Sequence, residues 1–352
     1  MKKVISGIQQ IGIGNRDVHR LWKWYRQHFG MDIRIFEEAA EAPLMTRYTG
    51  GEVHSRNAAL AMNMQGGGGF EIWQFTSREA QAPPFTTHLG DLGIYITKLK
   101  ARNVEATYRQ FQKDRLDLCG TVHKGPDGKP HFYLKDPDGN LFEICEANDW
   151  FGKTSSPTGG IYGAVIGVSN MEKSLKLYQE VLDYDRVVYD RTGTFEDLED
   201  LNGGKAAFRR VLLEHSRARK GAFSKLLGAS QIELIQREDG GGRKLFHHRY
   251  WGDMGYIHLC FDVRNMDTLQ KECTAAGFPF TIDSANSFDM GKAAGRFAYI
   301  EDPDGTWIEF VETHKLPVVE KWNWFMDIRN RQAEKPLPNW MLKALKFNRI
   351  KD

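Results

Sequence analysis

The sequence predicts an α+β protein of four modules, each with the element order β-α-β-β-β. The main observation is a repeated hairpin: residues 134–146 and 299–312 share the pattern Asp-Pro-Asp-Gly-x-x-x-Glu, which ends at Glu143 and Glu309. A second set of matches lies 162 residues apart, where Gly-Asp-Leu-Gly at 90–93 corresponds to Gly-Asp-Met-Gly at 252–255. Matches at a constant offset indicate repeated structural units.

The first module begins with a predicted strand at residues 3–14, which carries Gln10 in its middle. A helix is expected at 17–29, because apolar side chains recur there at helical spacing. Three further strands are expected at 31–36, 57–64 and 70–75, and the last of them carries Glu71.

The second module follows two adjacent prolines at 83–84. It contains a predicted strand at 92–98, a helix at 104–111 and the hairpin that ends at Glu143. Proline fixes φ at the first corner of the hairpin turn, and glycine accepts the positive φ that the turn requires. Residues 152–160 (Gly-Lys-Thr-Ser-Ser-Pro-Thr-Gly-Gly) are small and polar, as expected of a linker.

The second half repeats this order, with a strand at 160–168, a helix at 171–182 and strands at 209–214 and 231–236. Glu233 corresponds to Glu71, and His258 to Ile96, both at the offset of 162. These matches predict a first domain at 1–151, a linker at 152–160, a second domain at 161–313 and a C-terminal helical extension at 314–352. The extension is rich in aromatic residues, and we expect it to pack back over a module or to form part of a subunit contact.

The composition points to an intracellular, cytoplasmic protein. The formal net charge is +2 over 352 residues, which is too small to favour nucleic acid or a membrane surface as partner. No apolar run approaches the length of a membrane span or a signal peptide. The four cysteines show no Cys-x-x-Cys spacing, so we expect reduced thiols.

On these motifs, residues 3–312 resemble the vicinal oxygen chelate superfamily, which includes glyoxalase I, methylmalonyl-CoA epimerase, extradiol dioxygenases and bleomycin-resistance binding proteins. The resemblance implies that modules pair into two cupped mixed sheets, and that each module offers one metal ligand in its first strand and one in its last. The positions here, in module order, are Gln10 and Glu71, Ile96 and Glu143, Gly163 and Glu233, and His258 and Glu309. Ile96 and Gly163 cannot bind metal, so at most one site is complete.

The pairing of the modules decides which residues meet. If neighbours in sequence pair, each site lacks one ligand. If the first module pairs with the fourth, Gln10, Glu71, His258 and Glu309 gather at one site, and Glu143 and Glu233 remain alone at the other. We favour this cross-pairing, because the complete set matches glyoxalase I enzymes whose first ligand is glutamine. Four modules then form both cups within one chain, so a monomer or a homodimer is expected.

This donor set suits one divalent metal ion, such as zinc, nickel, iron, cobalt or manganese. The resemblance implies a lyase or isomerase of glyoxalase I or epimerase type, which acts on a small substrate with adjacent oxygens through an enediolate-like intermediate. Glu309 is the preferred catalytic base and Glu71 the alternative. Gln9 could replace Gln10 if the strand shifted by one residue.

Two other functions remain open. An extradiol dioxygenase would need two histidines and one carboxylate, whereas Gly163 occupies the second histidine position. A metal-free binding protein of the bleomycin-resistance type could hold a planar ligand with aromatic residues such as Tyr162, Trp73 and Trp307. The simplest structural reading is that His258 is only a core histidine and that the hairpin glutamates face water.

Overall fold

A computed structural model describes residues 2–285, 288–290, 293–319 and 324–351. The strands of the first half are β1 (Val4–Asn15), β2 (Ile33–Glu41), β3 (Ser55–Met62), β4 (Gly69–Phe75), β5 (Gly93–Ala101), β6 (Asp117–Lys124), β7 (Pro130–Lys135) and β8 (Leu141–Glu146). Those of the second half are β9 (Thr158–Gly167), β10 (Arg186–Gly193), β11 (Phe208–Glu214), β12 (Gln231–Arg237), β13 (Gly255–Arg264), β14 (Ile282–Asp283), β15 (Phe288–Met290), β16 (Ala293–Glu301), β17 (Trp307–Val319) and β18 (Trp324–Asp327).

The main helices are α1 (Val18–Phe29), α2 (Val104–Lys113), α3 (Met171–Leu175), which continues as π-helical turns (Lys176–Val181), α4 (Ser224–Leu227), α5 (Met266–Ala276) and α6 (Asn339–Ala344). The short 3-10 helices are η1 (Pro43–Tyr48), η3 (Glu196–Leu198) and η5 (Leu345–Asn348). α1, α2 and α3 begin at Asp17, Asn103 and Asn170, whose side chains accept a hydrogen bond from the backbone three residues later.

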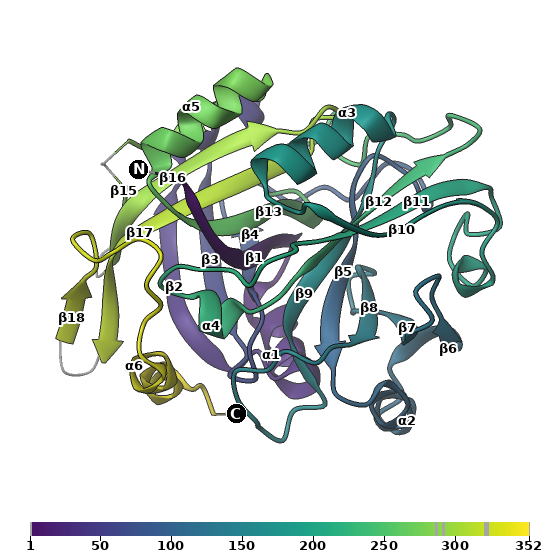
Figure 1. Cartoon of the computed structure of the whole chain (residues 1–352), viewed down its shortest axis with the longest axis horizontal. Coiled ribbons are helices and arrows are strands. Elements are labelled where there is room, and N and C mark those ends of the chain that lie inside the picture. Colours follow the sequence, from purple (N-terminus) through teal and green to yellow (C-terminus); the bar gives the residue numbers. More distant parts are fainter. Residues whose placement is uncertain (1, 286–287, 291–292, 320–323, 352) are drawn as a thin grey trace.

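The described strands form two curled mixed sheets, and each sheet takes strands from both halves of the chain (Figure 1). The first sheet has the order β14-β16-β17-β13-β1-β4-β3-β2, with β15 and β18 at its side, and the second has the order β10-β11-β12-β9-β5-β8-β7-β6. The first module therefore pairs with the fourth and the second with the third, which agrees with the favoured cross-pairing. The sequence halves 1–151 and 161–313 consequently do not coincide with the two sheets.

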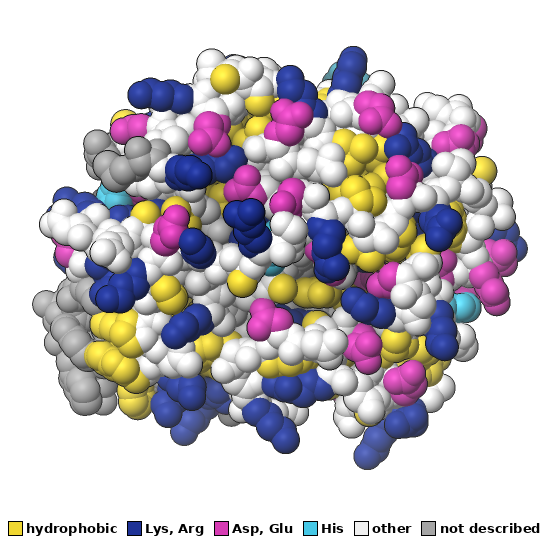
Figure 2. Space-filling model, in the orientation of Figure 1, with side chains coloured by type: hydrophobic (Ala, Val, Ile, Leu, Met, Phe, Trp, Pro, Cys, Tyr) yellow, Lys and Arg dark blue, Asp and Glu magenta, His cyan; other side chains and the backbone are white. Residues whose placement is uncertain are grey.

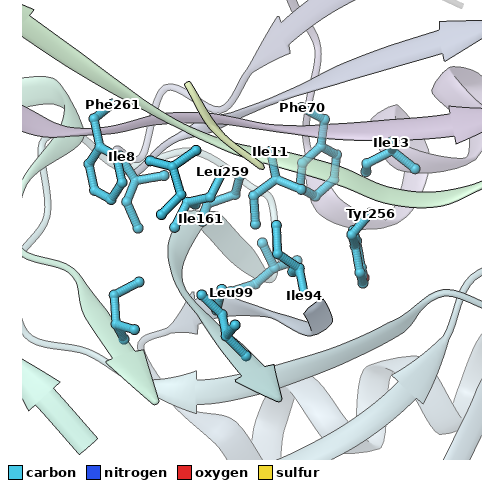
Figure 3. Close-up of a cluster of buried hydrophobic side chains, with 14 of the residues drawn as sticks. Ile8, Ile11, Ile13, Phe70, Ile94, Leu99, Ile161, Tyr256, Leu259 and Phe261 are labelled. Atoms are coloured by element: carbon cyan, nitrogen blue, oxygen red, sulfur yellow. The ribbon is translucent and has the colours of Figure 1, made fainter. Parts of the chain in front are cut away.

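The main hydrophobic core lies between the sheets. Alternation along β1 directs Ile11 and Ile13 to the core, while Gln10 and Gly12 take the other face. Figure 3 shows side chains of β1 and β13 facing Ile94, Leu99 and Ile161 of the second sheet. Each sheet thus packs one face on the core and leaves its other face free to form a cup.

Two equivalent hydrogen bonds also join the sheets. The Tyr25 hydroxyl of α1 donates to Asp136 Oδ2 at 2.6 Å, and the Tyr178 hydroxyl donates to Asp302 Oδ2 at 3.2 Å. Asp136 and Asp302 open the two Asp-Pro-Asp-Gly turns and also accept backbone N–H groups within those turns. The repeated hairpin motif therefore serves both the local turn and the contact between sheets.

In the described part of the C-terminal segment, residues 314–319 and 324–351, the helices lie from Asn339 onward. β17 continues to Val319 and pairs with β18, so the segment begins as an extension of the first sheet rather than as the helix expected from sequence. Sheet pairing satisfies this backbone before the helices begin directly after Pro338. α6 and η5 then pack back against the fold through Leu342 and Leu345, as expected.

Basic and acidic side chains are interspersed over the face drawn in Figure 2, in keeping with the small net charge. Among the described residues, no helix has both the length and the apolar character that crossing a membrane requires.

Candidate metal centre

Gln10, Glu71, His258 and Glu309 meet in the cup of the first sheet. His258 Nε2 lies 3.1 Å from Glu309 Oε2 and 3.2 Å from Glu71 Oε2. Gln10 Nε2 lies 3.0 Å from Glu71 Oε2 and 3.5 Å from Glu309 Oε2. The fold therefore brings together all four side chains that the sequence analysis grouped.

Four adjacent strands position these side chains. β1 carries Gln10 and lies between β4, which carries Glu71, and β13, which carries His258. β17 pairs with β13 and carries Glu309 opposite Cys260. Because β1 joins the first module to the fourth, the site exists only through cross-pairing.

Gly12 makes room for the His258 ring. A Cβ atom added at this glycine would lie 2.5 Å from His258 Cε1, well inside van der Waals contact. β1 can therefore pass directly beside the imidazole only without a side chain at this position. Gly12 in the run Ile-Gly-Ile-Gly at residues 11–14 could have indicated this close approach, but the sequence analysis did not use it.

Two aromatic residues that sequence reasoning missed hold the imidazole in place. Tyr299 of β16 places its hydroxyl 3.4 Å from His258 Nδ1. Trp251 stacks parallel to the ring, with centroids 5.9 Å apart. A partner on Nδ1 leaves Nε2 directed at the two carboxylates, the arrangement that orients a ligating histidine. Tyr299 opens the repeated stretch 299–312 and Trp251 directly precedes the Gly-Asp-Met-Gly motif, but no spacing indicated either residue.

The carboxylates of Glu71 and Glu309 give the site a net negative charge, which a bound cation would compensate. Burial alone would lower the pKa of the His258 imidazole, but Glu309 and Glu71 outweigh burial and raise the pKa to about 9. Within the described part of the chain, Gln10 Oε1 is buried without a hydrogen-bond partner, and His258 Nε2 faces two carboxylate oxygens without a well-aligned hydrogen bond to either. An imidazole, two carboxylates and an amide oxygen are suitable donors for a divalent ion, so these residues fit one.

Three of the four side chains, those of Gln10, Glu71 and Glu309, form part of the lining of a cavity of about 390 Å³. This volume is within the range of sites that bind small molecules. Trp73, one of the aromatic residues proposed from sequence to hold a ligand, also lines the cavity. Trp307 instead packs with Tyr48 and Phe246, and Tyr162 lies in a small cluster of the second sheet.

Comparison with known proteins agrees with this architecture. The family model described as glyoxalase/bleomycin resistance protein/dioxygenase superfamily matches residues 7–144 and 160–310. The chain belongs to this superfamily. Members of the superfamily commonly bind a divalent metal ion. Comparison with curated proteins gave no match.

Solved structures show the same superfamily fold. Glyoxalase I from Zea mays is 14% identical, with a TM-score of 0.54, and the match covers 88% of this chain and 92% of that one. A putative dioxygenase from Bacillus subtilis is 15% identical, with a TM-score of 0.53 and coverage of 89% and 86%. At such identities the similarity establishes the fold and leaves the reaction open.

The second cup of this superfamily fold holds a lysine between its two glutamates. Lys98 Nζ of β5 lies 3.0 Å from Glu143 Oε2 and 2.8 Å from Glu233 Oε2. Arg210 Nε donates to Glu233 Oε1 at 2.7 Å, and Arg210 also pairs with Asp197 at 2.8 Å. The sequence analysis left Glu143 and Glu233 alone in this cup. That expectation was incomplete, because side chains of neighbouring strands supply two fixed cations.

Lys98 and Arg210 determine which side chains in the second cup are charged. Burial alone would lower the pKa of Lys98, yet Glu143 and Glu233 raise it well above its usual value. Burial alone would raise the pKa of Glu233, but Arg210 and Lys98 hold it well below its usual range. The lysine ammonium thus provides the positive charge between the carboxylates of Glu143 and Glu233, and a small cavity of about 20 Å³ adjoins them.

His131 extends this network and makes stability depend on pH. Its Nδ1 lies 3.1 Å from Glu143 Oε1, and its Nε2 lies 3.4 Å from Asp197 Oδ2. Burial alone would lower the pKa of His131, but Asp197 and Glu143 raise it to about 9 from 6.5. Because the folded-state pKa is the higher one, the stabilisation is fully present below pH 6.5 and is lost as the pH rises through about 9.

We therefore predict that His131→Asn flattens the pH dependence of stability between these two values. The wild-type protein should lose on the order of 3 kcal/mol of unfolding free energy over this interval through His131. Denaturant unfolding at several pH values measures the difference, with His19→Asn on the surface as control. Equal pH profiles for wild type and His131→Asn would contradict the prediction.

Proposed function

We propose that the chain is a divalent-metal-dependent lyase or isomerase of the glyoxalase I or epimerase type, which acts on a small substrate with adjacent oxygens. The observation that supports this function is the convergence of Gln10, Glu71, His258 and Glu309 beside a cavity of about 390 Å³. Superfamily membership supports the same class of chemistry. The donor atoms suit zinc, nickel, iron, cobalt or manganese.

These four side chains would hold the ion, and the protein's own groups would fix their geometry. When bound, a divalent ion would polarise two adjacent substrate oxygens and stabilise the negative charge that develops on them. Tyr299 and Trp251 keep the His258 ring oriented, and Gly12 keeps β1 close to it. Rotation of the Gln10 amide by half a turn would exchange its nitrogen for the oxygen Oε1.

Glu309 is the proposed general base. Its carboxylate adjoins the cavity, and its Oε2 lies 3.5 Å from Gln10 Nε2, against 3.0 Å for Glu71. Before the amide rotates, it therefore restrains Glu309 less than it restrains Glu71. In the proposed reaction Glu309 takes the proton from the carbon next to the substrate carbonyl and returns it to a neighbouring atom. Glu71 is the second candidate for this role.

The other two functions have weaker support. An extradiol dioxygenase uses two histidines and one carboxylate, whereas the cluster found among the described residues contains His258 and two glutamates. A metal-free binding protein could use the same cavity, but it would have no need to bury two carboxylates around an imidazole. We further propose a small molecule as partner rather than nucleic acid or membrane, a cytoplasmic location, and a monomer or homodimer.

Elemental analysis of protein purified without chelators tests the metal site. Wild-type protein should contain about one divalent ion per chain, and His258→Ala should lose it. About two ions per chain would contradict the single site, because the second cup would then also bind metal. Metal absent from both proteins would overturn the proposal in favour of a metal-free binding protein.

A further inference from the structure

The cavity beside the candidate metal centre is lined on one side by two segments that lie outside the repeated strands and helices of the modules. One is the connection between β11 and β12, whose Phe223, Leu226 and Leu227 line the cavity. The other is the C-terminal segment, which contributes Leu345 and Asn348 of η5. We call these two segments the roof. Figure 1 shows α4 and α6 on the same side of the first sheet.

Specific contacts join the two parts of the roof to each other and to the sheet. Leu337 N–H donates to Ala222 O at 2.9 Å, and Gly221 N–H donates to Glu334 O at 3.1 Å. At the end of the chain, Ile350 N–H donates to Asp32 O at 2.9 Å. The roof is thus part of the packed fold, and its shape is available to a ligand without a closing motion.

The walls are predominantly apolar. Besides the roof, the cavity is lined by large apolar or aromatic side chains of the first sheet and of two flanking loops: Ile35, Phe36, Leu44, Met45, Leu60, Met62, Trp73, Trp251, Phe297, Tyr299 and Val311. Removal of this surface from water by a ligand of matching character is favourable. A cavity of 150 Å³ is enough for benzene, so about 390 Å³ holds a substituted ring.

The charges around the cavity disfavour an anionic substrate arm. The lining contains four carboxylates, Glu38, Glu41, Glu71 and Glu309, against two cationic side chains, Arg56 and Lys315. Arg56 Nη2 already pairs with Glu38 Oε1 at 2.7 Å. A bound divalent ion would offset the charges of Glu71 and Glu309 only. Two carboxylates then remain against two cationic side chains, so a further carboxylate or phosphate of the substrate would gain no net attraction along the walls and would lose its hydration against the apolar lining.

We propose that the cavity selects a neutral, carbon-rich substrate, an aryl or branched alkyl compound with two adjacent oxygens. The oxygens lie at the Glu71 and Glu309 end, and the apolar group lies against the roof. The placement of the substrate oxygens rests on the proposed function. The placement of the apolar group rests only on the residues that line the cavity. The C-terminal segment is then a specificity element of the site.

Three hydroxamic acids test the proposal, because they share the same pair of oxygens. On metal-loaded protein, calorimetry should show that benzohydroxamate binds at least tenfold more tightly than acetohydroxamate. 4-Carboxybenzohydroxamate, which adds one negative charge, should bind at least tenfold more weakly than benzohydroxamate. Equal Kd values for the three compounds would overturn the substrate class and leave the metal site intact.

Variants of the roof test whether this surface causes the preference for benzohydroxamate over acetohydroxamate. Phe223→Ser and Leu345→Ala, one from each part of the roof, should each reduce the benzo-to-aceto ratio severalfold. Phe347→Ser is the matched control, because Phe347 lies in the same short helix as Leu345 but is 66% exposed and does not line the cavity. Thermal melts verify that each variant is folded. A ratio unchanged in both roof variants would remove the roof from the proposal.

A metal-free measurement separates this inference from the proposed function. Benzamide should bind the metal-free wild-type protein more tightly than acetamide, since both compounds present the same amide. If benzamide shows the preference but no metal binds, the proposed function fails and the apolar cavity stands. If benzamide shows no preference, the proposal for the cavity is wrong whether or not metal is bound.

Discussion

Replacement of Glu309 by glutamine is expected to reduce turnover by about 10²–10⁴-fold, the usual contribution of a general base. An amide oxygen can still serve as a metal ligand, but it cannot accept a proton. Metal content should therefore stay near one ion per chain even though turnover falls. The measurement is the exchange of the carbon-bound proton of 2-hydroxyacetophenone with deuterium from solvent, followed by NMR, together with elemental analysis of the same sample.

The internal repeat supplies a matched control for this variant. Glu143 is the equivalent residue of the other hairpin, 166 positions earlier, and it lies in the second cup with Lys98. Glu143→Gln should leave both metal content and proton exchange unchanged, although it should lower stability. Glu71→Gln distinguishes the two candidate bases. Loss of exchange in Glu71→Gln with retention in Glu309→Gln would transfer the role of base to Glu71.

The sequence was sufficient to predict the group of four side chains, because two kinds of information agreed. The hairpin repeat identified Glu309. The constant offset of 162 identified His258 as the residue that corresponds to Ile96 in the repeat. The complementary distribution of ligand residues then favoured cross-pairing, which the sheet order confirms. Periodicity alone would have left His258 as one more residue in an apolar strand.

The second cup could not be predicted in this way. Lys98 lies on β5, two residues after the ligand position of Ile96, and its partners Glu143 and Glu233 come from β8 and β12. Arg210 corresponds in strand register to His131 of the second module, but nothing in the sequence pattern marks these two residues as partners of Glu233 and Glu143. Ion pairs between strands of different modules depend on register and twist, which the sequence pattern does not specify.

The internal repeat could not predict the residues of the roof either. Phe223 lies in a connection between strands, and Leu345 lies in the C-terminal segment, so neither has an equivalent in another module. The sequence predicted that the C-terminal segment packs back over the fold, but not over which surface. Non-repeated segments are where members of one fold differ, so they are the natural place for specificity.

Replacement of Lys98 by methionine is expected to destabilise the protein by about 3 kcal/mol, since removal of one partner leaves buried charges uncompensated. Glu143 and Glu233 would then face each other across the second cup with no cation between them. His131 and Arg210 still contact them, which places the expected cost at the lower end of the usual range. The midpoint of denaturant unfolding measures the change.

The surface pair Lys220 and Glu334 gives the comparison that isolates burial. Their nitrogen and oxygen atoms lie 2.6 Å apart, but both side chains are more than half exposed. Lys220→Met should therefore change stability by less than about 1 kcal/mol. Lys98→Met combined with Glu143→Gln should recover part of the loss, because the second change removes one of the two opposed charges. If Lys98→Met unfolds at the wild-type midpoint, the attraction in this cup only balances the desolvation of the ammonium. Lys98 would then add nothing to stability. Its remaining role in the second cup would be to exclude a second metal ion.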